Sequence, residues 1–242
     1  MSKQILLRIE LPTDARVFIS QFREYVARDL DGQSDVPELF HYDSTGKPAQ
    51  GMPRTRFVGG RRWVGILTDE DRADMLYKVM GNAVRAVHHL CGSVTPVKFE
   101  EHTLGLSQIY TPRSYWIREM VIKKRRQRTR ETEQKELIRQ RILSGLHRQA
   151  DEYGIAWPGD DALDLKVNDD FRQRGLELRT TQGATGEYVD LIDASFTVKT
   201  ELLGFWFAGN LTSRGYGRIG VDLAALAVNF RREQAAPRRM AA

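Results

Sequence analysis

The chain holds little of what builds a cross-linked, metal-bound or membrane-embedded protein. Cys91 is the single cysteine among 242 residues, so an internal disulfide and a cysteine-based zinc site are both excluded. No apolar run approaches the roughly 18–20 residues that a membrane-spanning helix needs. The short apolar stretch 5–7 is interrupted by Arg8 and Glu10 and lacks a signal-peptide cleavage site. We therefore expect a cytoplasmic protein with no membrane partner.

Histidine is scarce too, and its spacing does not indicate a metal site. The chain has five histidines. Neighbouring residues on a helix point about 100° apart, so His88 and His89 cannot both face one ion. His102 and His147 are remote from them in the sequence. We expect no metal and no other cofactor.

Positive charge is present in excess, and the excess is concentrated. Lys and Arg number 37 against 32 Asp and Glu, for a net charge of +5. The segment 118–148 alone holds eleven basic and four acidic residues, a net +7 that leaves −2 for the rest. One basic element on a near-neutral body indicates a polyanionic partner. Since residues 123–136 include no apolar side chain to insert into a membrane, nucleic acid is favoured over anionic lipid.

Hydrophobic periodicity predicts an α+β protein. Apolar positions recur at helical spacing over 14–31 and from Thr68 to Cys91. Strand patterns cover 3–11, 38–43, 54–58, 62–67 and 96–106, and later 163–167, 175–181, 187–192, 196–203 and 204–208. The order β-α-β-β-α-β in about the first hundred residues is that of a ferredoxin-like domain, an antiparallel sheet with two helices on one face.

Residues 117–155 are predicted to form a helical finger that leaves the body of the protein. From Lys123 to Glu136 the chain has no apolar residue, no glycine and no proline, and it is rich in helix formers. A helix that is polar on all sides cannot lie in a core, so it must project into solvent or onto a partner. The other interpretation is an ordinary solvated charge run. The basic residues that we expect to contact RNA phosphates are Lys123, Lys124, Arg125, Arg126, Arg128 and Arg130.

The segment 204–220 is rich in glycine and contains the pattern G-x-G-x-x-G at 215–220. A dinucleotide-binding fold is excluded, because only 22 residues follow and cannot supply the rest of a βαβ unit. One interpretation is a hairpin whose glycines adopt positive φ. The other, which two arginines among the glycines favour, is a phosphate-binding loop: Arg214 and Arg218 contact phosphates and Tyr216 stacks on a base. The glycines that define the loop are Gly209, Gly215, Gly217 and Gly220.

This motif, G-x5-G-x-G-x-x-G with interleaved arginines after a late strand, resembles the signature of the RAMP superfamily of CRISPR proteins. Segments 39–43 and 56–60 and the basic insertion make the whole chain most similar to its CRISPR RNA-processing endoribonucleases, in the type IV branch. The resemblance implies tandem ferredoxin-like (RRM-like) domains. They are an N-terminal domain at 1–106, a degenerate C-terminal domain at 107–230 that contains the finger 117–155 and the loop 204–220, and a basic tail at 231–242.

The resemblance also implies a function. It is metal-independent cleavage of precursor CRISPR repeat RNA, in which a ribose 2′-hydroxyl attacks the adjacent phosphate and expels the 5′-oxygen. The protein then stays bound to the mature crRNA as a subunit of a type IV effector complex, beside other subunits. A non-catalytic RNA-binding scaffold of such a complex is the main alternative, and a general nucleic-acid binder without a CRISPR role is a further one.

Such chemistry needs a base at the 2′-hydroxyl, an acid at the leaving oxygen and fixed positive charge beside the phosphorane. The resemblance places these groups near the first helix and the segment after it. There we assign Arg23 to charge stabilisation and His41 to acid–base work, with Tyr42 or Tyr25 assisting. The alternatives are a solvated surface arginine, a hydrogen-bonded structural histidine and a core tyrosine at position 25.

Overall fold

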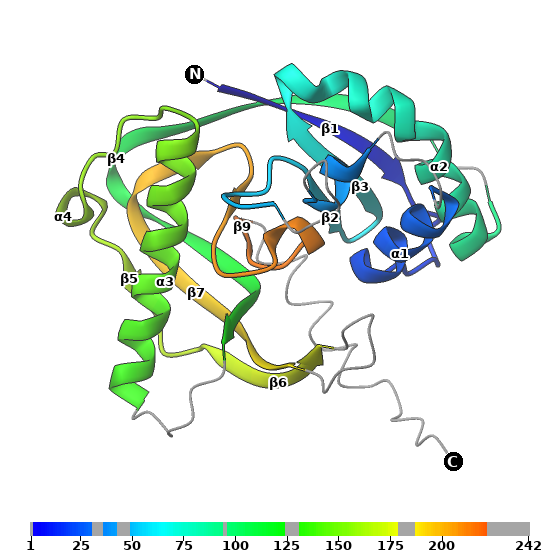
Figure 1. Ribbon diagram of the computed structural model, residues 1–242. Helices are drawn as coiled ribbons and strands as arrows, with labels where there is room; N and C mark the ends of the chain where they lie inside the picture. The colour runs from blue at the N-terminus through cyan, green and yellow to red at the C-terminus, as the bar shows by residue number, and fades with distance from the viewer. Residues whose placement is uncertain are drawn as a thin grey trace, which may run out of the picture.

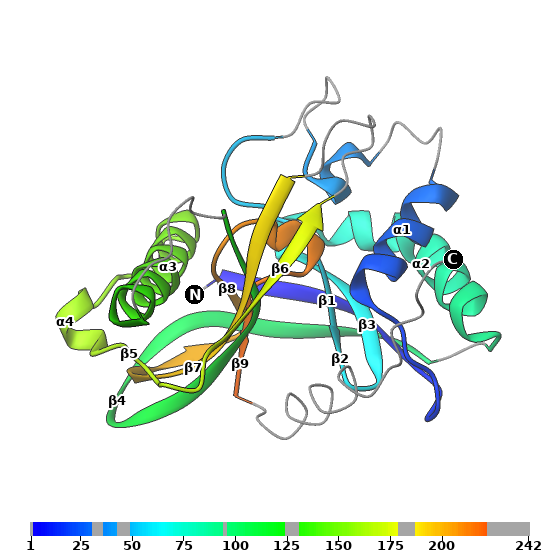
Figure 2. The ribbon, with the colours of Figure 1, turned by 90° about the horizontal axis from the view of Figure 1, so that it is seen from below.

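The computed structural model describes six parts of the chain, residues 2–30, 36–42, 49–93, 96–123, 131–178 and 187–221. They form an antiparallel sheet with helices at its two ends, α1 and α2 at one and α3 at the other (Figures 1 and 2). This arrangement confirms the predicted combination of helices with an antiparallel sheet. None of the helices within the described parts is both long and apolar enough to span a membrane.

The first half of the chain has the predicted order of strands and helices. Its elements are β1 (Ser2–Glu10), α1 (Ile19–Asp29), β2 (Arg56–Gly60), β3 (Trp63–Asp69), α2 (Ala73–Cys91) and the start of β4 (Val97–Lys123). The strands pair antiparallel in the order β2-β3-β1-β4. Phe22 and Val26 of α1 are buried together with Leu7 and Ile9 of β1, because an apolar stripe at helical spacing packs on one face of a sheet.

The chain between α1 and β2 differs from the sequence prediction. Residues 38–43 are predicted to be extended, yet Pro37–Phe40 form a short 3-10 helix, η1. Proline at the first helical position presets the backbone for a helical turn, and Leu39 is fully buried. His41 then ends the turn in the left-handed conformation, at φ 63°. A second 3-10 turn, η2 (Glu70–Arg72), precedes α2, which therefore begins later than predicted.

The sheet face opposite α1 and α2 is covered by the C-terminal part of the chain. Side chains alternate between the two faces of a strand, so Phe57 packs with the helices whereas Val58 points the other way. Val58 packs there with Leu6, Leu67 and Phe207. Arg56 shares the face of Val58, and its guanidinium lies over the Phe207 ring at 4.7 Å. A charged side chain is thus enclosed between the sheet and the segment that follows β7.

Strand β4 is 27 residues long and joins the two halves of the molecule. Its first part, to Leu104, pairs with β1, and from Gly105 onward it pairs with β7 (Glu187–Leu203). The register shifts between Gln108 and Arg113 and again between Ile117 and Met120. The change of partner falls close to the division predicted at 106/107, but the assignment of the second half as a ferredoxin-like domain stays a prediction.

The helical finger predicted over 117–155 is wrong in its first part. Residues up to Lys123 belong to β4 and pair with β7 and β9 (Arg218–Gly220), because Ile117, Val121 and Ile122 are β-branched and suit a strand. A helix does follow, α3 (Glu131–Glu152), but it packs on the body through Ile138, Ile142 and Leu146, each fully buried. Lys124 to Arg130 lie outside the described residues, so the contacts predicted for them stay predictions.

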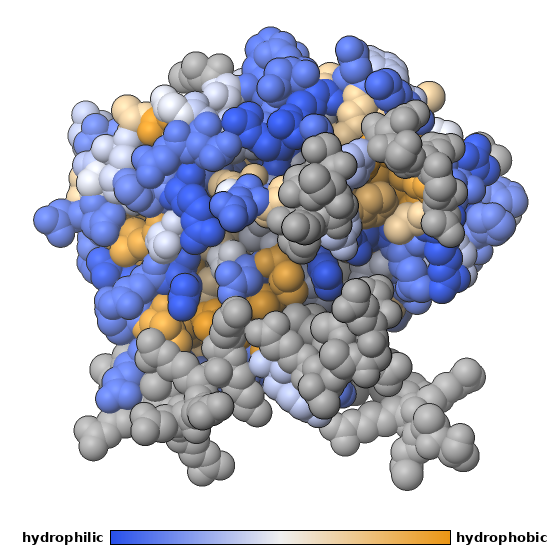
Figure 3. All heavy atoms as spheres, viewed as in Figure 1, coloured by the Kyte–Doolittle hydropathy of each residue, from blue (hydrophilic) through white to orange (hydrophobic). Residues whose placement is uncertain are grey.

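The remaining elements are short except for β7. They are α4 (Asp160–Leu163), β5 (Lys166–Val167), β6 (Arg172–Leu178), β8 (Trp206–Phe207) and the 3-10 helix η3 (Thr212–Arg214). The two strands predicted at 187–192 and 196–203 are one continuous strand that pairs with β4, β5 and β6. Hydrophilic residues make up most of the described surface on the face shown in Figure 3, with hydrophobic residues in smaller patches.

Candidate functional site

The glycine-rich loop closes against the first helix, in the middle of the molecule (Figure 1). Gly215 ends η3 at φ 90°, and a Cβ atom there would lie 2.6 Å from the Phe57 carbonyl oxygen and 2.7 Å from Ile19 Cγ2. At Gly217, with φ 70°, a Cβ atom would lie 1.8 Å from the Ala208 carbonyl oxygen. These glycines therefore let the loop pack on α1, β2 and β8.

The other two glycines of the predicted loop differ from each other. A Cβ atom at Gly209 would meet Met120 Cγ at 2.6 Å, whereas Gly220 faces open space. At three of the four positions the room left by the missing side chain is filled by protein atoms. This supports the structural interpretation of the glycines over an exposed phosphate-binding backbone. The glycines affect the site indirectly, because the packing that they allow sets the position of Arg214.

Arg214, from η3, approaches Arg23, from α1. Partial burial lowers the pKa of Arg23 below its ordinary value, and the positive charge of Arg214 lowers it further. Tyr42 acts in the opposite direction on the same pKa, so it also lies near Arg23. The Arg23 guanidinium lies over the rings of Phe40 at 5.1 Å and Phe57 at 5.9 Å, and its buried Nε has no hydrogen-bond acceptor among the described residues. Two guanidinium groups held near each other form a site for an anion.

His41 directly precedes Tyr42 in the chain and lines a cavity together with Ser213, the neighbour of Arg214. Burial lowers the pKa of its imidazole below the ordinary value, and the nearby charge of Arg56 lowers it further. A histidine with a lowered pKa is mostly neutral at pH 7, so it is able to accept a proton. Tyr42 follows in the chain with its side chain 37% exposed. The structure thus brings two of the residues predicted to be catalytic, Arg23 and Tyr42, close to Arg214 of the predicted RNA-binding set, and His41 directly precedes Tyr42.

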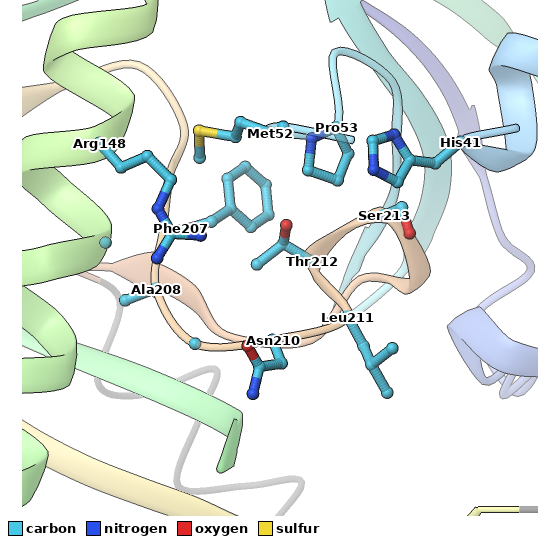
Figure 4. Close-up of a pocket in the computed structure, with 13 residues that line it drawn as sticks. His41, Met52, Pro53, Arg148, Phe207, Ala208, Asn210, Leu211, Thr212 and Ser213 are labelled. Atoms are coloured by element: carbon cyan, nitrogen blue, oxygen red, sulfur yellow. The ribbon is translucent and has the colours of Figure 1, made fainter. Parts of the chain in front are cut away.

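His41 also lines a cavity of about 190 Å³ between α3, the segment 51–53 and the loop after β8. Figure 4 shows Met52, Pro53 and His41 on one side of it. Thr212 points toward its middle, Ser213 lies beside His41, and Arg148 reaches in from α3 (Figure 4). No described acidic residue is among those that line it.

Two other predicted RNA-binding residues make internal contacts. Arg218 donates a hydrogen bond from Nη1 to the Gly59 carbonyl oxygen at 2.5 Å and lies over the rings of Trp63 and Phe205. Tyr216 packs against Val121. Burial raises the pKa of its hydroxyl, and the negative charge of Glu119 raises it further. Both side chains thereby attach the loop to the body. Of the finger set, Lys123 ends β4, and the others lie outside the described residues.

Sequence reasoning missed Arg56 and did not connect Arg148 to the site. Arg56 is 1% exposed; its guanidinium lies against the Tyr153 hydroxyl, and no carboxylate of the described residues pairs with it. The signal for it was an arginine at the start of the apolar strand R-F-V, since a charged residue in a buried strand is rare without a partner. Arg148 was counted with the finger, but it lies on α3 facing the cavity.

Several other arginines have the carboxylate partners that these arginines lack within the described residues. Arg28 pairs with Glu24, Arg54 with Asp69 and Glu152, and Arg85 with Asp29. Across the described residues no carboxylate pairs with Arg23, Arg56, Arg148 or Arg214. Over the same residues no three His, Cys, Asp or Glu side chains are grouped so as to hold a metal ion. The arrangement is able to bind an anion and to move a proton beside it.

The family model described as type IV CRISPR-associated endonuclease Csf5 matches residues 1–223. The solved structure titled "Csf5, CRISPR-Cas type IV Cas6 crRNA endonuclease" is 32% identical, covers 91% of this chain and 99% of its own, and superposes with a TM-score of 0.80. A structure titled Cas6b is 12% identical, covers 90% and 99%, and has a TM-score of 0.61. A second, titled "CRISPR RNA processing endoribonuclease Cas6b", is 10% identical, covers 90% and 98%, and has a TM-score of 0.57. No curated protein matches the chain.

Proposed function

The chain belongs to the family of type IV CRISPR-associated endonuclease Csf5, and we propose from this premise that it cleaves precursor CRISPR repeat RNA without a metal ion. The observation that carries the proposal is the approach of Arg23, Arg214 and Tyr42, the neighbour of His41 in the chain, with no described carboxylate on either arginine. A phosphodiester group supplies the negative charge that this site lacks. Guanidinium groups are suited to it because they present paired donors to phosphate oxygens.

In the proposed step the ribose 2′-oxygen forms a bond to phosphorus, and the bond from phosphorus to the 5′-oxygen breaks. His41 takes the proton of the 2′-hydroxyl, since its lowered pKa keeps it neutral. Arg23 and Arg214 stabilise the charge that builds on the phosphorane oxygens. Tyr42 donates a proton to the leaving 5′-oxygen. The products are a 2′,3′-cyclic phosphate and a 5′-hydroxyl.

The partners follow from the same proposal. We assign the basic residues Lys123 to Arg130 to the phosphates of the repeat RNA, outside the cleavage site. The protein then keeps the mature crRNA and joins other subunits in a type IV effector complex. Tandem ferredoxin-like domains, with β4 shared between them, are the architecture that we propose for this binding.

The test uses labelled repeat RNA in EDTA, beside the same RNA with one 2′-deoxy nucleotide at the cut. Cleavage of the all-ribose RNA alone is expected. Tight binding with no cleavage of either RNA would support a non-catalytic scaffold instead, and cleavage of both would exclude attack by the 2′-hydroxyl. Loss of cleavage in EDTA that returns with a divalent cation would overturn metal independence.

A further inference from the structure

The cavity beside His41 has features that the cleavage step does not use. Arg148 reaches into it and pairs with no described carboxylate. The side chains of Thr212 and Ser213, 5% and 8% exposed, make no hydrogen bond to any described residue. Thr212 points toward the middle and Ser213 lies next to His41 (Figure 4). One cation and two hydroxyls, in a space that no acidic residue of the described chain lines, suit an anion.

A second cation lies behind the wall of this cavity. Arg56 stacks on Phe207, a residue of the cavity wall, with its charge buried and with no ion pair to any described carboxylate. It lies close enough to Tyr153 to act on the pKa of that hydroxyl, and its charge is also felt at His41. A buried charge without a partner is strongly unfavourable, and its field is little screened in the interior. Negative charge in the cavity would compensate it.

We propose that this cavity is a second phosphate subsite, next to the cleavage site, in which Arg148, Thr212 and Ser213 bind a phosphate group of the RNA. Arg56 contributes positive charge from behind Phe207. The inference rests on the proposed function, because it takes RNA as the ligand. His41 borders both sites, so the bound phosphate belongs to a nucleotide close to the cut. It is either an internal phosphodiester or the terminal phosphate of the cleaved product.

The experiment compares Arg148→Ala with Arg141→Ala. Both arginines are exposed on α3, seven residues and about two helical turns apart, so on nearly the same face, but only Arg148 lines the cavity. Binding of a repeat RNA blocked by a 2′-deoxy nucleotide is measured against salt concentration. Arg148→Ala should weaken binding about tenfold and reduce the salt slope by about one. Arg141→Ala should stay within about twofold of the original protein.

Binding of product RNAs that end in a 3′-phosphate or a 3′-hydroxyl distinguishes a terminal phosphate from an internal phosphodiester as the group bound in the subsite. If Arg148→Ala removes a preference for the 3′-phosphate, the subsite holds the terminal phosphate. If it weakens both RNAs equally, and more than Arg141→Ala does, the subsite holds an internal phosphodiester. Equal behaviour of the two variants on every RNA would overturn the subsite. Failure of the original protein to cleave would overturn the proposed function alone, because these measurements need no cleavage.

Discussion

Two regions of this protein use arginine in opposite ways. Where the end of α3 meets β3, Arg54 donates to Asp69 at 2.9 Å and to Glu152 at 3.0 Å, and Tyr153 donates a further hydrogen bond to Asp69. Two residues later in the chain, Arg56 is buried beside the Tyr153 hydroxyl, and no described carboxylate forms an ion pair with it. Charge compensated within the protein holds elements together, whereas uncompensated charge remains available to an anionic ligand.

The largest effect is expected from removing an uncompensated arginine at the cleavage site. Arg23→Ala should lower the cleavage rate by about a thousandfold, because the phosphorane loses a fixed donor. Single-turnover rates at saturating protein check this, and RNA affinity should change far less. Arg28→Ala is the matched control on the same helix, where the arginine forms an exposed pair with Glu24. Equal rates for Arg23→Ala and Arg28→Ala would remove Arg23 from the mechanism.

The compensated region should respond through stability instead. Asp69→Ala leaves Arg54 and Tyr153 without a shared, 4% exposed partner, so the free energy of unfolding should fall by about 3 kcal/mol. Urea denaturation measures the loss. Cleavage per folded molecule, assayed at a temperature where the variant is folded, should stay close to that of the original protein. A selective loss of cleavage with unchanged stability would contradict the division between the two regions.

Features that depend on local sequence could be predicted, whereas those that depend on tertiary packing could not. Local patterns predicted β1, β2, β3, α1 and α2, because a helix or strand that buries one face shows that periodicity in its own residues. The extent of β4 was missed, since its pairing changes from β1 to β7 partway along and local periodicity does not report a partner. The turn at η1 was missed because its left-handed end is at His41, a non-glycine residue.

The candidate site was predicted in parts. Arg23 and His41 were named from a resemblance, and Arg214 from its glycine neighbours, but no sequence signal joined them. Arg23 and Arg214 approach each other because Gly215 lets the loop pack on Ile19 and Phe57. Arg218 shows the converse, since the same glycine context contains an arginine that hydrogen-bonds to Gly59. Which arginine remains uncompensated is a property of the tertiary packing.

A further prediction concerns the pH dependence of cleavage, which His41 should set. Burial and the charge of Arg56 lower its pKa, so a base at this position should give a kcat/KM that rises with pH. The midpoint should lie below the ordinary value of about 6.5, with a plateau above it. His41→Ala should lower the cleavage rate by about a hundredfold and abolish this rise of kcat/KM with pH. Because the folded protein binds this proton less readily than the unfolded chain, His41 should also lower stability as the pH falls below about 6.5.

If kcat/KM of the His41→Ala variant still rose with pH in the same range, the general base would be another group. Comparison with the Tyr42→Phe variant distinguishes the general base from the general acid. Loss of the proton donor should change the pH–rate profile at high pH, whereas loss of the base changes it at low pH. Neither substitution should alter the salt dependence of RNA binding, because neither removes a cation.

The smallest effect, and the most direct test of the comparison, comes from Arg54→Met beside Arg56→Met. Arg54→Met breaks two ion pairs and leaves the buried Asp69 with fewer partners, so the free energy of unfolding should fall by about 2 kcal/mol. Arg56→Met removes a buried cation that forms no ion pair with a described carboxylate. Methionine can pack on Phe207 in its place, so stability should stay unchanged or rise by about 1 kcal/mol, while RNA binding weakens. If Arg56→Met destabilised the fold more than Arg54→Met, Arg56 would be a structural residue, and its charge would not be held for a ligand.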